Sequence, residues 1–265
     1  MVSSKYTHLF FDLDNTIWDF NSNSYDALQI ALEKLGLLKA ISSYADFFKI
    51  YSDVNDRLWE QYRQGTVTKK VLSIQRFEET FEKNEIPLTI GGAILNDSYL
   101  HEMPLQTRLI DGARELLDYL HGRYKMSIIT NGFKEVQYHK IHRSELSKYF
   151  GKIFISEEVG AQKPERVIFE HAAKSVNARK KNSLMIGDSW DADILGAMNY
   201  GIDQIYFSPE FEKPDSPLEI GIPSPKNNTI SNSTPYFNTH KTIKINFNLT
   251  TTTFINHLEE IFSIL

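Results

Sequence analysis

The first strong signal along the chain is a largely apolar run from Tyr6 to Phe11 that stops abruptly at Asp12. A run of this kind, rich in aromatic residues, is typical of a strand buried on both faces in a parallel sheet. After Pro104, helical and strand-like patterns alternate. We expect helices at 111–121, 133–146, 164–176 and 191–200, and strands at 125–129, 153–155, 183–186 and 204–207. This alternation predicts a parallel sheet wrapped by helices.

Residues 22–102 follow a different pattern. They contain no comparable strand, and their apolar positions recur three or four residues apart around 27–35, 47–58 and 71–81. A period close to 3.6 residues is typical of amphipathic helices. We therefore expect an all-helical block between the first strand and the alternating region.

The last part of the chain is harder to interpret. Residues 208–240 are rich in Pro, Ser, Asn and Thr and show little periodicity, so we interpret them as a surface excursion. Residues 242–245 alternate like an edge strand. A closing amphipathic helix is predicted from the apolar residues Phe254, Ile255, Leu258, Ile261 and Phe262.

Composition excludes several kinds of chemistry. With 265 residues, 41% of them hydrophobic, the chain can bury a sizeable core. The net charge of -5 gives no basic surplus, so we expect no nucleic-acid polymer as partner. The absence of Cys excludes a thiolate nucleophile and thiolate metal ligands. The chain begins without a signal-peptide pattern and has no apolar stretch of about 18 residues, so we expect no membrane partner and a cytoplasmic location.

Two carboxylates stand two residues apart where the first strand ends. Asp12 and Asp14 belong to the segment Asp12-Leu13-Asp14-Asn15-Thr16, and continued strand geometry would turn both to the same side. One carboxylate can attack phosphorus, while the other protonates the leaving oxygen and later deprotonates water. The alternative is a turn with two solvated acids. The apolar strand just before Asp12 favours the catalytic interpretation.

More acids follow the strand predicted at 183–186. Asp188 comes directly after Gly187, and Asp193 stands five residues further on. A small number of oxygen ligands, with room for waters and a phosphate, suits Mg²⁺. The alternative is a helix N-terminus whose acids complement the helix dipole. Asp193 is also interpretable as a capping group.

Donors for a phosphate group follow two other elements. Thr130, Asn131 and Gly132 come after the strand at 125–129 and supply a hydroxyl, an amide and backbone N–H groups. Lys163 precedes Pro164 at the start of a predicted helix, so its side chain can reach the same edge. Each signal is weak alone, since most such triplets are turns and most lysines are solvated. Together they collect at the carboxyl edge of the predicted sheet, where open α/β folds bind ligands.

The order of these signals resembles the four signature motifs of the haloacid dehalogenase (HAD) superfamily. The matching residues are Asp12-x-Asp14-x-Thr16, Thr130, Lys163 and Gly187-Asp188-x-x-x-x-Asp193. The resemblance implies an α/β fold with a Rossmann-like parallel-sheet core and an inserted α-helical, C1-type cap. It places the core at 1–18 and 103–265, including the excursion at 208–240, and the cap at 19–102.

The resemblance also implies a role for each matching residue. Asp12 would be the nucleophile, and Asp14 the general acid and base. Asp12, the Asp14 backbone carbonyl and Asp188 would hold Mg²⁺. Thr130 and Asn131 would bind the transferring phosphoryl group, and Lys163 would neutralise charge on nucleophile and phosphate. Supporting roles would fall to Thr16 and Asp193.

The second Asp distinguishes reactions within the superfamily. The dehalogenases resemble this chain but lack an acid at the position of Asp14, because a halide needs no proton to leave. Asp14 therefore favours phosphate esters. The expected activity is a Mg²⁺-dependent phosphomonoester hydrolase with an aspartyl-phosphate intermediate. A sugar-phosphate phosphatase and a phosphomutase of the same superfamily remain alternatives.

Shorter matches are similar to the YjjG-type branch of pyrimidine 5′-nucleotidases, which hydrolyse noncanonical nucleoside monophosphates. They are Trp18-Asp19-Phe20, Asn55-x-x-Leu58-Trp59-x-x-Tyr62, Arg76-Phe77, Thr130-Asn131-Gly132-Phe133 and Ile155-Ser156-Glu157-Glu158-Val159-Gly160. This resemblance implies a small phosphorylated metabolite, a nucleotide, as the partner, and a monomer or homodimer. Trp18, Phe20 and Trp59 can stack on a nucleobase, but core packing is the alternative. Arg76 can bind a carbonyl edge or pair within the protein.

Overall fold

The computed structural model describes residues 5–209, 235–237, 243–247 and 250–265. The chain forms two compact units. The sheet unit comprises 1–19, 109–134 and 145–265, and the helical unit comprises 20–108 and 135–144. Most of the predicted excursion at 208–240 lies outside the described residues. None of the helices in the described ranges is long and apolar enough to cross a membrane.

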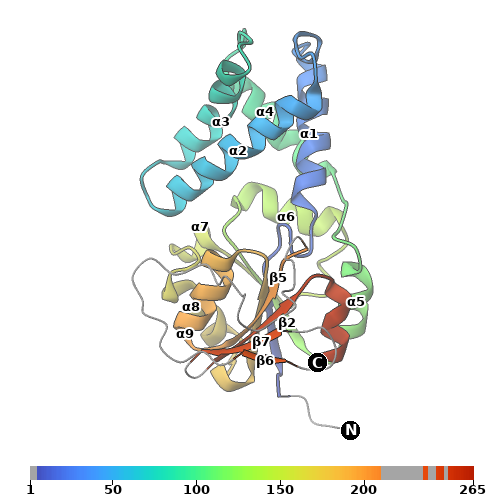
Figure 1. Cartoon of the computed structure of the whole chain (residues 1–265), viewed down its shortest axis with the longest axis vertical. Coiled ribbons are helices and arrows are strands. Elements are labelled where there is room, and N and C mark those ends of the chain that lie inside the picture. The colour runs from blue at the N-terminus through green and yellow to red at the C-terminus, as the bar shows by residue number, and fades with distance from the viewer. Residues whose placement is uncertain (1–4, 210–234, 238–242, 248–249) are drawn as a thin grey trace. The chain divides into compact units, whose positions relative to one another are not determined.

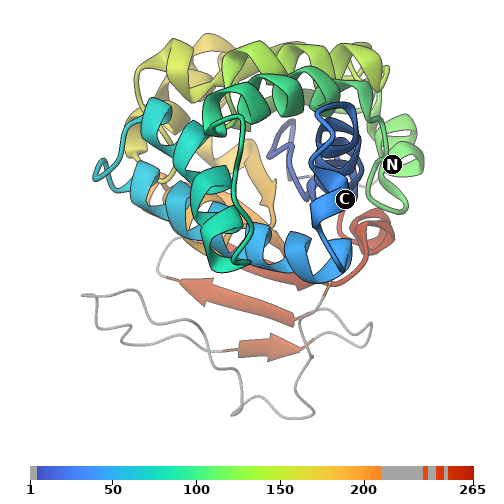
Figure 2. The same cartoon turned by 90° about the horizontal axis from the view of Figure 1, so that it is seen from above.

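The sheet unit is built on one sheet, which has eight strands within the described residues, in the order β3-β2-β1-β4-β5-β8-β7-β6. The first six run parallel: β3 (Lys152–Ile155), β2 (Lys125–Thr130), β1 (His8–Phe11), β4 (Ser183–Gly187), β5 (Asp203–Phe207) and β8 (Thr250–Ile255). The last two, β7 (Ile243–Phe247) and β6 (Pro235–Phe237), extend the sheet antiparallel (Figure 2).

Helices cover both faces of this sheet, as Figure 1 shows. Phe10, Ile129 and Met185 face one side, where they pack against α8 (Arg166–Ser175) and α9 (Gly196–Tyr200). Because side chains alternate along a strand, their neighbours face the other side. There α5 (Ala113–Leu120) lies beside the C-terminal 3-10 helix η6 (Leu258–Ser263). The shorter helices are α7 (Ser156–Val159), η3 (Lys180–Asn182) and η4 (Trp190–Leu195).

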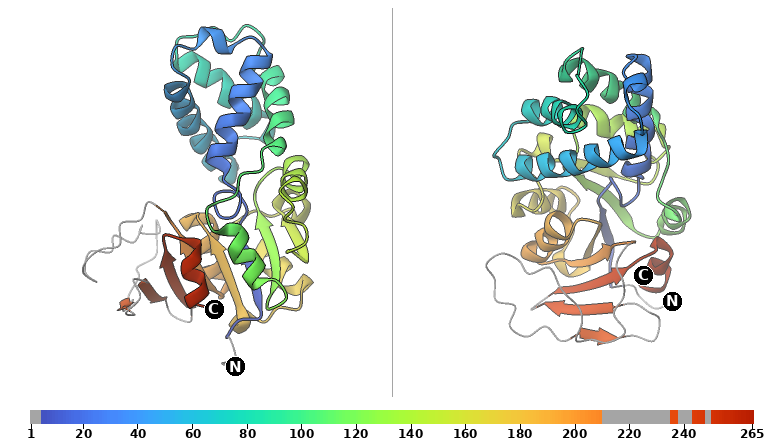
Figure 3. Two further views of the ribbon diagram at one scale, coloured as in Figure 1. Left: turned by 90° about the vertical axis from the view of Figure 1, so that its right-hand side faces the viewer. Right: turned by 45° about the horizontal axis from the view of Figure 1, so that its top comes forward.

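The helical unit follows β1 in the chain (Figure 3). Its elements are α1 (Phe20–Lys34), η1 (Leu38–Ala40), α2 (Tyr44–Arg63), α3 (Lys69–Lys83), α4 (Gly92–Glu102), η2 (Met103–Leu105) and residues 135–143 of α6 (Lys134–Arg143). The Ser43 and Thr68 side chains cap α2 and α3 by accepting backbone N–H bonds. The interior is aromatic, with the Tyr51 and Phe77 rings stacked and the Tyr99 ring edge-on to both.

The fold class expected from the sequence is confirmed: a parallel sheet with flanking helices and a helical insertion after β1. Three local predictions are wrong. An edge strand was expected at 242–245, but β7 in this region pairs with both β8 and β6. The closing helix was expected to include Phe254 and Ile255, but both complete strand β8, which is paired on both sides. The helix expected at 191–200 begins as a π-helical turn, η4, and only α9 is α-helical.

Candidate active site

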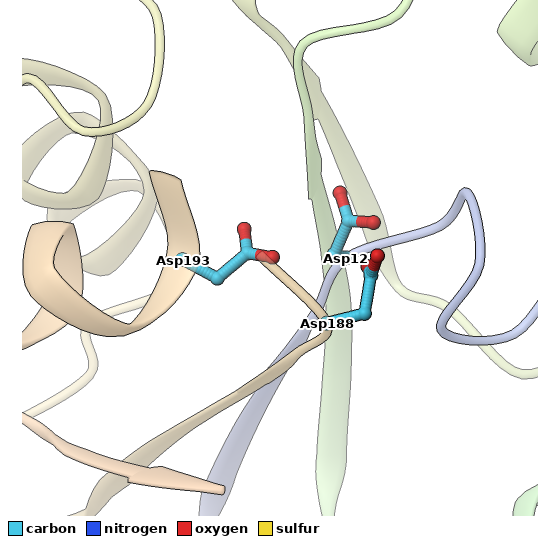
Figure 4. Close-up of side chains that lie close together, drawn as sticks. All are labelled: Asp12, Asp188 and Asp193. Carbon is cyan, nitrogen blue, oxygen red and sulfur yellow. The ribbon is translucent and has the colours of Figure 1, made fainter. Parts of the chain in front are cut away.

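Three carboxylates meet at the carboxyl edge of the sheet (Figure 4). Asp12 follows β1 and Asp188 follows β4, two neighbouring parallel strands, and Asp193 projects from η4. One carboxylate oxygen from each residue lies within 4.8 Å of the others. The backbone N–H of Asp12 donates to the carbonyl oxygen of Ile186 at 2.9 Å, which continues the β1–β4 pairing to this residue. The structure therefore brings Asp12 together with two acids that lie more than 170 positions further along the chain.

Lys163 lies between two of these carboxylates. Its Nζ is 2.5 Å from Asp12 Oδ1 and 2.6 Å from Asp193 Oδ1, and the side chain is only 2% exposed. Burial alone would lower the pKa of the Lys163 ammonium, but the two ion pairs outweigh it and raise that pKa. The side chain is therefore a fixed positive charge inside the site.

Burial of the carboxyl groups also changes their acidity. Desolvation raises the pKa of Asp12 to about 7; the Lys163 ammonium opposes this rise, and the Asp193 and Asp14 carboxylates add to it. Desolvation and repulsion from Asp12 and Asp193 raise the pKa of Asp188 well above its usual range. In both cases burial is the larger cause, and repulsion between the carboxylates adds to it.

A metal ion bound here would relieve the repulsion between these carboxylates. The site offers oxygen donors, which hard divalent cations such as Mg²⁺ prefer. Asp193 already faces Lys163 through Oδ1 and accepts the Ser189 N–H through Oδ2 at 3.1 Å. The residues present thus fit a divalent cation, and Asp12 and Asp188 are its best candidate ligands.

Gly187 allows Asp193 to enter the site. A Cβ on Gly187 would lie 2.3 Å from Asp193 Oδ2, closer than any side chain tolerates. The π-helical turn η4 that carries Asp193 begins after Ser189, whose side chain accepts the backbone N–H of Ala192 at 3.2 Å. Single π turns of this kind are frequent at functional sites. The glycine that ends β4 is the one sequence feature from which this close approach could have been inferred.

The segment after Asp12 leaves the strand and forms a tight turn. Asn15 adopts a left-handed conformation with φ of 59°, and its N–H donates to Trp18 O at 2.7 Å. The fully buried Thr16 hydroxyl donates to Asp188 Oδ1 at 2.8 Å, so this residue orients a candidate metal ligand. Asp14 lies in the turn and is partly exposed. Its predicted role as general acid and base stays a prediction.

Thr130 and Asn131 were both expected to bind a phosphoryl group. Thr130 ends β2, is buried, and its Oγ1 accepts the backbone N–H of Gly132 at 3.2 Å. The Asn131 side chain instead bonds to the backbone of Lys163: Nδ2 donates to the carbonyl oxygen at 2.9 Å, and Oδ1 accepts the N–H at 2.8 Å. Sequence reasoning missed this contact, because the two residues are 32 positions apart.

The residues predicted to determine specificity are divided between the two units. Trp18, in the sheet unit, is fully buried. In the helical unit, the Phe20 ring centroid lies 5.3 Å from Lys140 Nζ. Trp59 is partly buried, and its ring packs edge-on against that of Tyr62 with centroids 5.7 Å apart. For Trp18, burial favours the packing alternative.

Arg76 lies inside the helical unit and is 2% exposed. Its guanidinium donates to Asn96 Oδ1 at 2.8 Å and to Asn55 Oδ1 at 3.5 Å. It also lies over the rings of Phe77 and Tyr99, 4.8 and 5.0 Å from their centroids. These contacts favour the structural alternative for Arg76 over direct substrate binding.

The sequence is similar to one protein family and to several characterised enzymes. The sequence profile of the haloacid dehalogenase-like hydrolases matches residues 6–201. The chain is 34% identical to the pyrimidine 5′-nucleotidase YjjG of Escherichia coli over 75% of this chain and 84% of that protein. It is also 34% identical to the pyrimidine 5′-nucleotidase PynA of Streptococcus pneumoniae, over 77% and 84%.

Other similar proteins include a phosphatase named for a different substrate and a solved structure. The glyceraldehyde 3-phosphate phosphatase of Pyrococcus abyssi is 28% identical over 75% of this chain and 80% of its own length. Among solved structures, magnesium-bound YfnB from Bacillus subtilis superimposes with a TM-score of 0.77 at 27% identity, covering 99% of both chains.

Proposed function

Because the chain belongs to the haloacid dehalogenase-like hydrolases, we propose that it is a Mg²⁺-dependent phosphatase of pyrimidine nucleoside 5′-monophosphates. One observation carries the chemical part of this proposal. The Lys163 ammonium is buried between Asp12 and Asp193, and Asp188 stands beside Asp12 at the same sheet edge. A buried cation, a nucleophilic carboxylate and a candidate metal ligand are thereby assembled in one place.

In the first step, a carboxylate oxygen of Asp12 attacks phosphorus. A bond forms between this oxygen and phosphorus, the ester P–O bond breaks, and the leaving oxygen takes a proton from Asp14. The product alcohol departs, and Asp12 carries an acyl phosphate. Lys163 neutralises charge on the equatorial oxygens while the group is transferred.

In the second step, a water molecule attacks the acyl phosphate. Asp14, now a carboxylate, takes a proton from the water, the bond between phosphorus and Asp12 breaks, and inorganic phosphate leaves. Both side chains return to their starting states. Throughout, Thr16 holds the Asp188 carboxylate in place through its hydrogen bond.

A bound Mg²⁺ would add Lewis-acid stabilisation of the phosphoryl oxygens. Asp12 and Asp188 are the side chains that would hold it, with the Asp14 backbone carbonyl as the further ligand that the family resemblance implies. With the cation bound, the pKa of both Asp12 and Asp188 would fall, because a positive charge favours the ionised carboxylates. Asp12 would then be ionised and ready to attack.

The nucleotide part of the proposal depends on the relatives. Two of them, each 34% identical over at least three quarters of this chain, act as pyrimidine 5′-nucleotidases. A sugar-phosphate phosphatase is the second candidate, supported by the 28% identity to a glyceraldehyde 3-phosphate phosphatase. Phosphomutase chemistry uses the same nucleophile, and differs in returning the phosphoryl group to the substrate.

A substrate panel tests this proposal. Phosphate release would be measured from UMP, dUMP, dTMP, sugar phosphates and pyrophosphate, with Mg²⁺ and with EDTA. We expect the highest kcat/KM for the pyrimidine nucleotides and no turnover in EDTA. A clear preference for sugar phosphates would replace the nucleotidase assignment. Formation of an isomeric sugar phosphate in place of free phosphate would indicate a mutase.

A further inference from the structure

The Asn131 side chain makes two hydrogen bonds to the backbone of a single residue, Lys163. Its amide nitrogen donates to the Lys163 carbonyl oxygen at 2.9 Å, and its amide oxygen accepts the Lys163 N–H at 2.8 Å. Both backbone polar groups of Lys163 are thus bound by one side chain. A planar amide that is held at both ends in this way has little freedom to rotate.

Lys163 lies in a segment that regular secondary structure does not hold. The segment 160–165 connects α7 to α8, so Lys163 has no helical or strand partner for its N–H and C=O. Buried backbone groups without partners are costly. Elsewhere the segment closes on itself, since the Glu165 N–H donates to the Gln162 carbonyl at 2.7 Å and the Gln162 N–H donates to the Glu165 carboxylate at 3.0 Å. Among the hydrogen bonds described for the Lys163 backbone, only those to Asn131, the residue after β2, tie it to another part of the chain.

The position of this backbone decides where the catalytic ammonium lies. Lys163 Nζ is 2.5 Å from Asp12 and 2.6 Å from Asp193, and its side chain is 2% exposed. The ammonium is held between both carboxylates, so a shift of the Lys163 backbone weakens these ion pairs unless the side chain leaves its present conformation. Misplacement by about 1 Å can cost about 100-fold in rate.

We propose that Asn131 is a positioning residue, which fixes the backbone of Lys163 so that its ammonium stays between Asp12 and Asp193. This role differs from the direct phosphoryl binding that the sequence predicts for Asn131. It rests on the proposed phosphatase activity, because its catalytic consequence is exerted through Lys163. The contact itself can be tested without turnover.

The first test is hydrogen exchange, compared between wild type and Asn131→Ala. We expect the segment 160–165 to exchange faster in the variant, because the Lys163 N–H loses its acceptor. Asn182→Ala is the matched control: Asn182 Nδ2 donates to the Lys5 carbonyl at 2.8 Å, and Asn182 lies just before the start of β4, at the opposite edge of the sheet. The control should leave exchange at 160–165 unchanged. Unchanged exchange in Asn131→Ala would overturn the proposal.

The second test is a double-mutant cycle with Lys163→Met, which removes the ammonium and keeps most of the side-chain volume. In the wild-type background, Asn131→Ala should lower kcat by about 10- to 100-fold, with KM within about two-fold. In the Lys163→Met background it should have almost no further effect, because residues that act through one another are not additive. Asn182→Ala should leave kcat unchanged in both backgrounds.

Two results would contradict the positioning role: a loss that multiplies fully with that of Lys163→Met, or a large rise in KM and in the inhibition constant for inorganic phosphate. Either would mean that the Asn131 side chain contacts the phosphoryl group. If the wild-type protein hydrolyses no phosphomonoester, the proposed function fails by itself. The hydrogen-exchange comparison still decides whether Asn131 holds Lys163.

Discussion

Lys163 faces two carboxylates, Asp12 and Asp193, and this arrangement explains why a charged side chain can be almost fully buried. Taking an ammonium out of water is costly unless paired charges and hydrogen bonds compensate. Here both carboxylates do so, and the pKa of Lys163 is raised. The same pairing keeps Asp12 aligned at the end of β1. At the residue scale, the site is therefore a set of mutually dependent charges.

Asp14→Asn tests the division of labour between the two acids after β1. We expect kcat/KM for UMP to fall about 100- to 10,000-fold, because the ribose oxygen needs a proton to leave. With p-nitrophenyl phosphate, whose leaving group is stable without protonation, kcat/KM should fall far less. Steady-state kinetics with both substrates would show the difference. An equal loss for both would mean that Asp14 is not the leaving-group acid.

At this scale the sequence indicated residue types better than contacts. A carboxylate directly after an apolar strand is a local pattern, so Asp12 and Asp188 were recognisable as candidates. The contact between Asn131 and Lys163 depends on how two loops meet in space, and no local pattern encodes it. For the same reason Arg76 was equally compatible with binding and with packing until its partners were visible.

At the scale of elements, one turn of π-helix determines where Asp193 points. β4 ends at Gly187, and the π-helical turn η4 begins three residues later, at Trp190. This turn places the Asp193 carboxylate against the end of the strand. A glycine is needed there because a Cβ would overlap the Asp193 side chain. The geometry of this element is thus part of the charge arrangement around Lys163.

Gly187→Ala should therefore be disruptive. The added Cβ would come within 2.3 Å of Asp193 Oδ2, so we expect a loss of about 1–3 kcal/mol in the free energy of unfolding. Turnover should fall as well, because Asp193 must move away from Lys163. Gly151→Ala is the control, since its Cβ would meet nothing closer than 3.8 Å. Chemical denaturation and kcat for both variants would check this, and equal behaviour of the two would refute it.

Within the helical unit, Arg76 joins α3 to α2 and α4 through Asn55 and Asn96. Arg76→Met should lower the free energy of unfolding by about 1–3 kcal/mol, because two buried acceptors lose their donor. KM should stay within about two-fold. Arg57, an exposed partner of Glu79 on the same helices, provides the control, and Arg57→Met should change stability by about 0.5 kcal/mol or less. A large rise in KM at unchanged stability would instead make Arg76 a substrate ligand.

The elements that were predicted wrongly show why periodicity has limits. Phe254 and Ile255 precede Leu258 and Ile261 at spacings that suit a helix, but the run before them is four threonines. These β-branched residues favour a strand, and β8 pairs with both β5 and β7. Strand pairing of this kind depends on residues distant in sequence. Most of the alternating region from 104 onward was predictable, because an apolar run or a helical period is a local pattern. The π-helical turn η4 was not, because apolar spacing does not distinguish it from an α-helix.

At the scale of the whole molecule, most of the helical unit is an insertion in the chain between β1 and β2. The sequence predicts this unit at 19–102. The compact helical unit of the structure spans 20–108 and also includes 135–144. The inclusion of part of α6 was not foreseeable, because that helix follows β2 and its periodicity resembles that of the sheet-covering helices. The role of the helical unit as a cap over the substrate stays a prediction.

Magnesium should stabilise the folded protein measurably. A cation that binds only the native state adds about 2.7 kcal/mol when its concentration is 100 times its Kd. We expect Tm to rise with Mg²⁺ relative to EDTA, with NaCl of matched ionic strength as control. Asp188→Asn should abolish this rise, while the metal-free protein should be no less stable, because a carboxylate that repels Asp12 is removed. An unchanged response to Mg²⁺ in the variant would place the metal elsewhere.

The central claim is that Asp12 carries the phosphoryl group during turnover. Rapid acid quench at saturating substrate and Mg²⁺, followed by mass spectrometry of the peptides, measures this directly. We predict one phosphoryl group on the peptide that contains Asp12, sensitive to hydroxylamine as an acyl phosphate is, and neither modification nor turnover in Asp12→Asn. Substantial turnover by Asp12→Asn, or a phosphoryl group on another residue, would contradict the account.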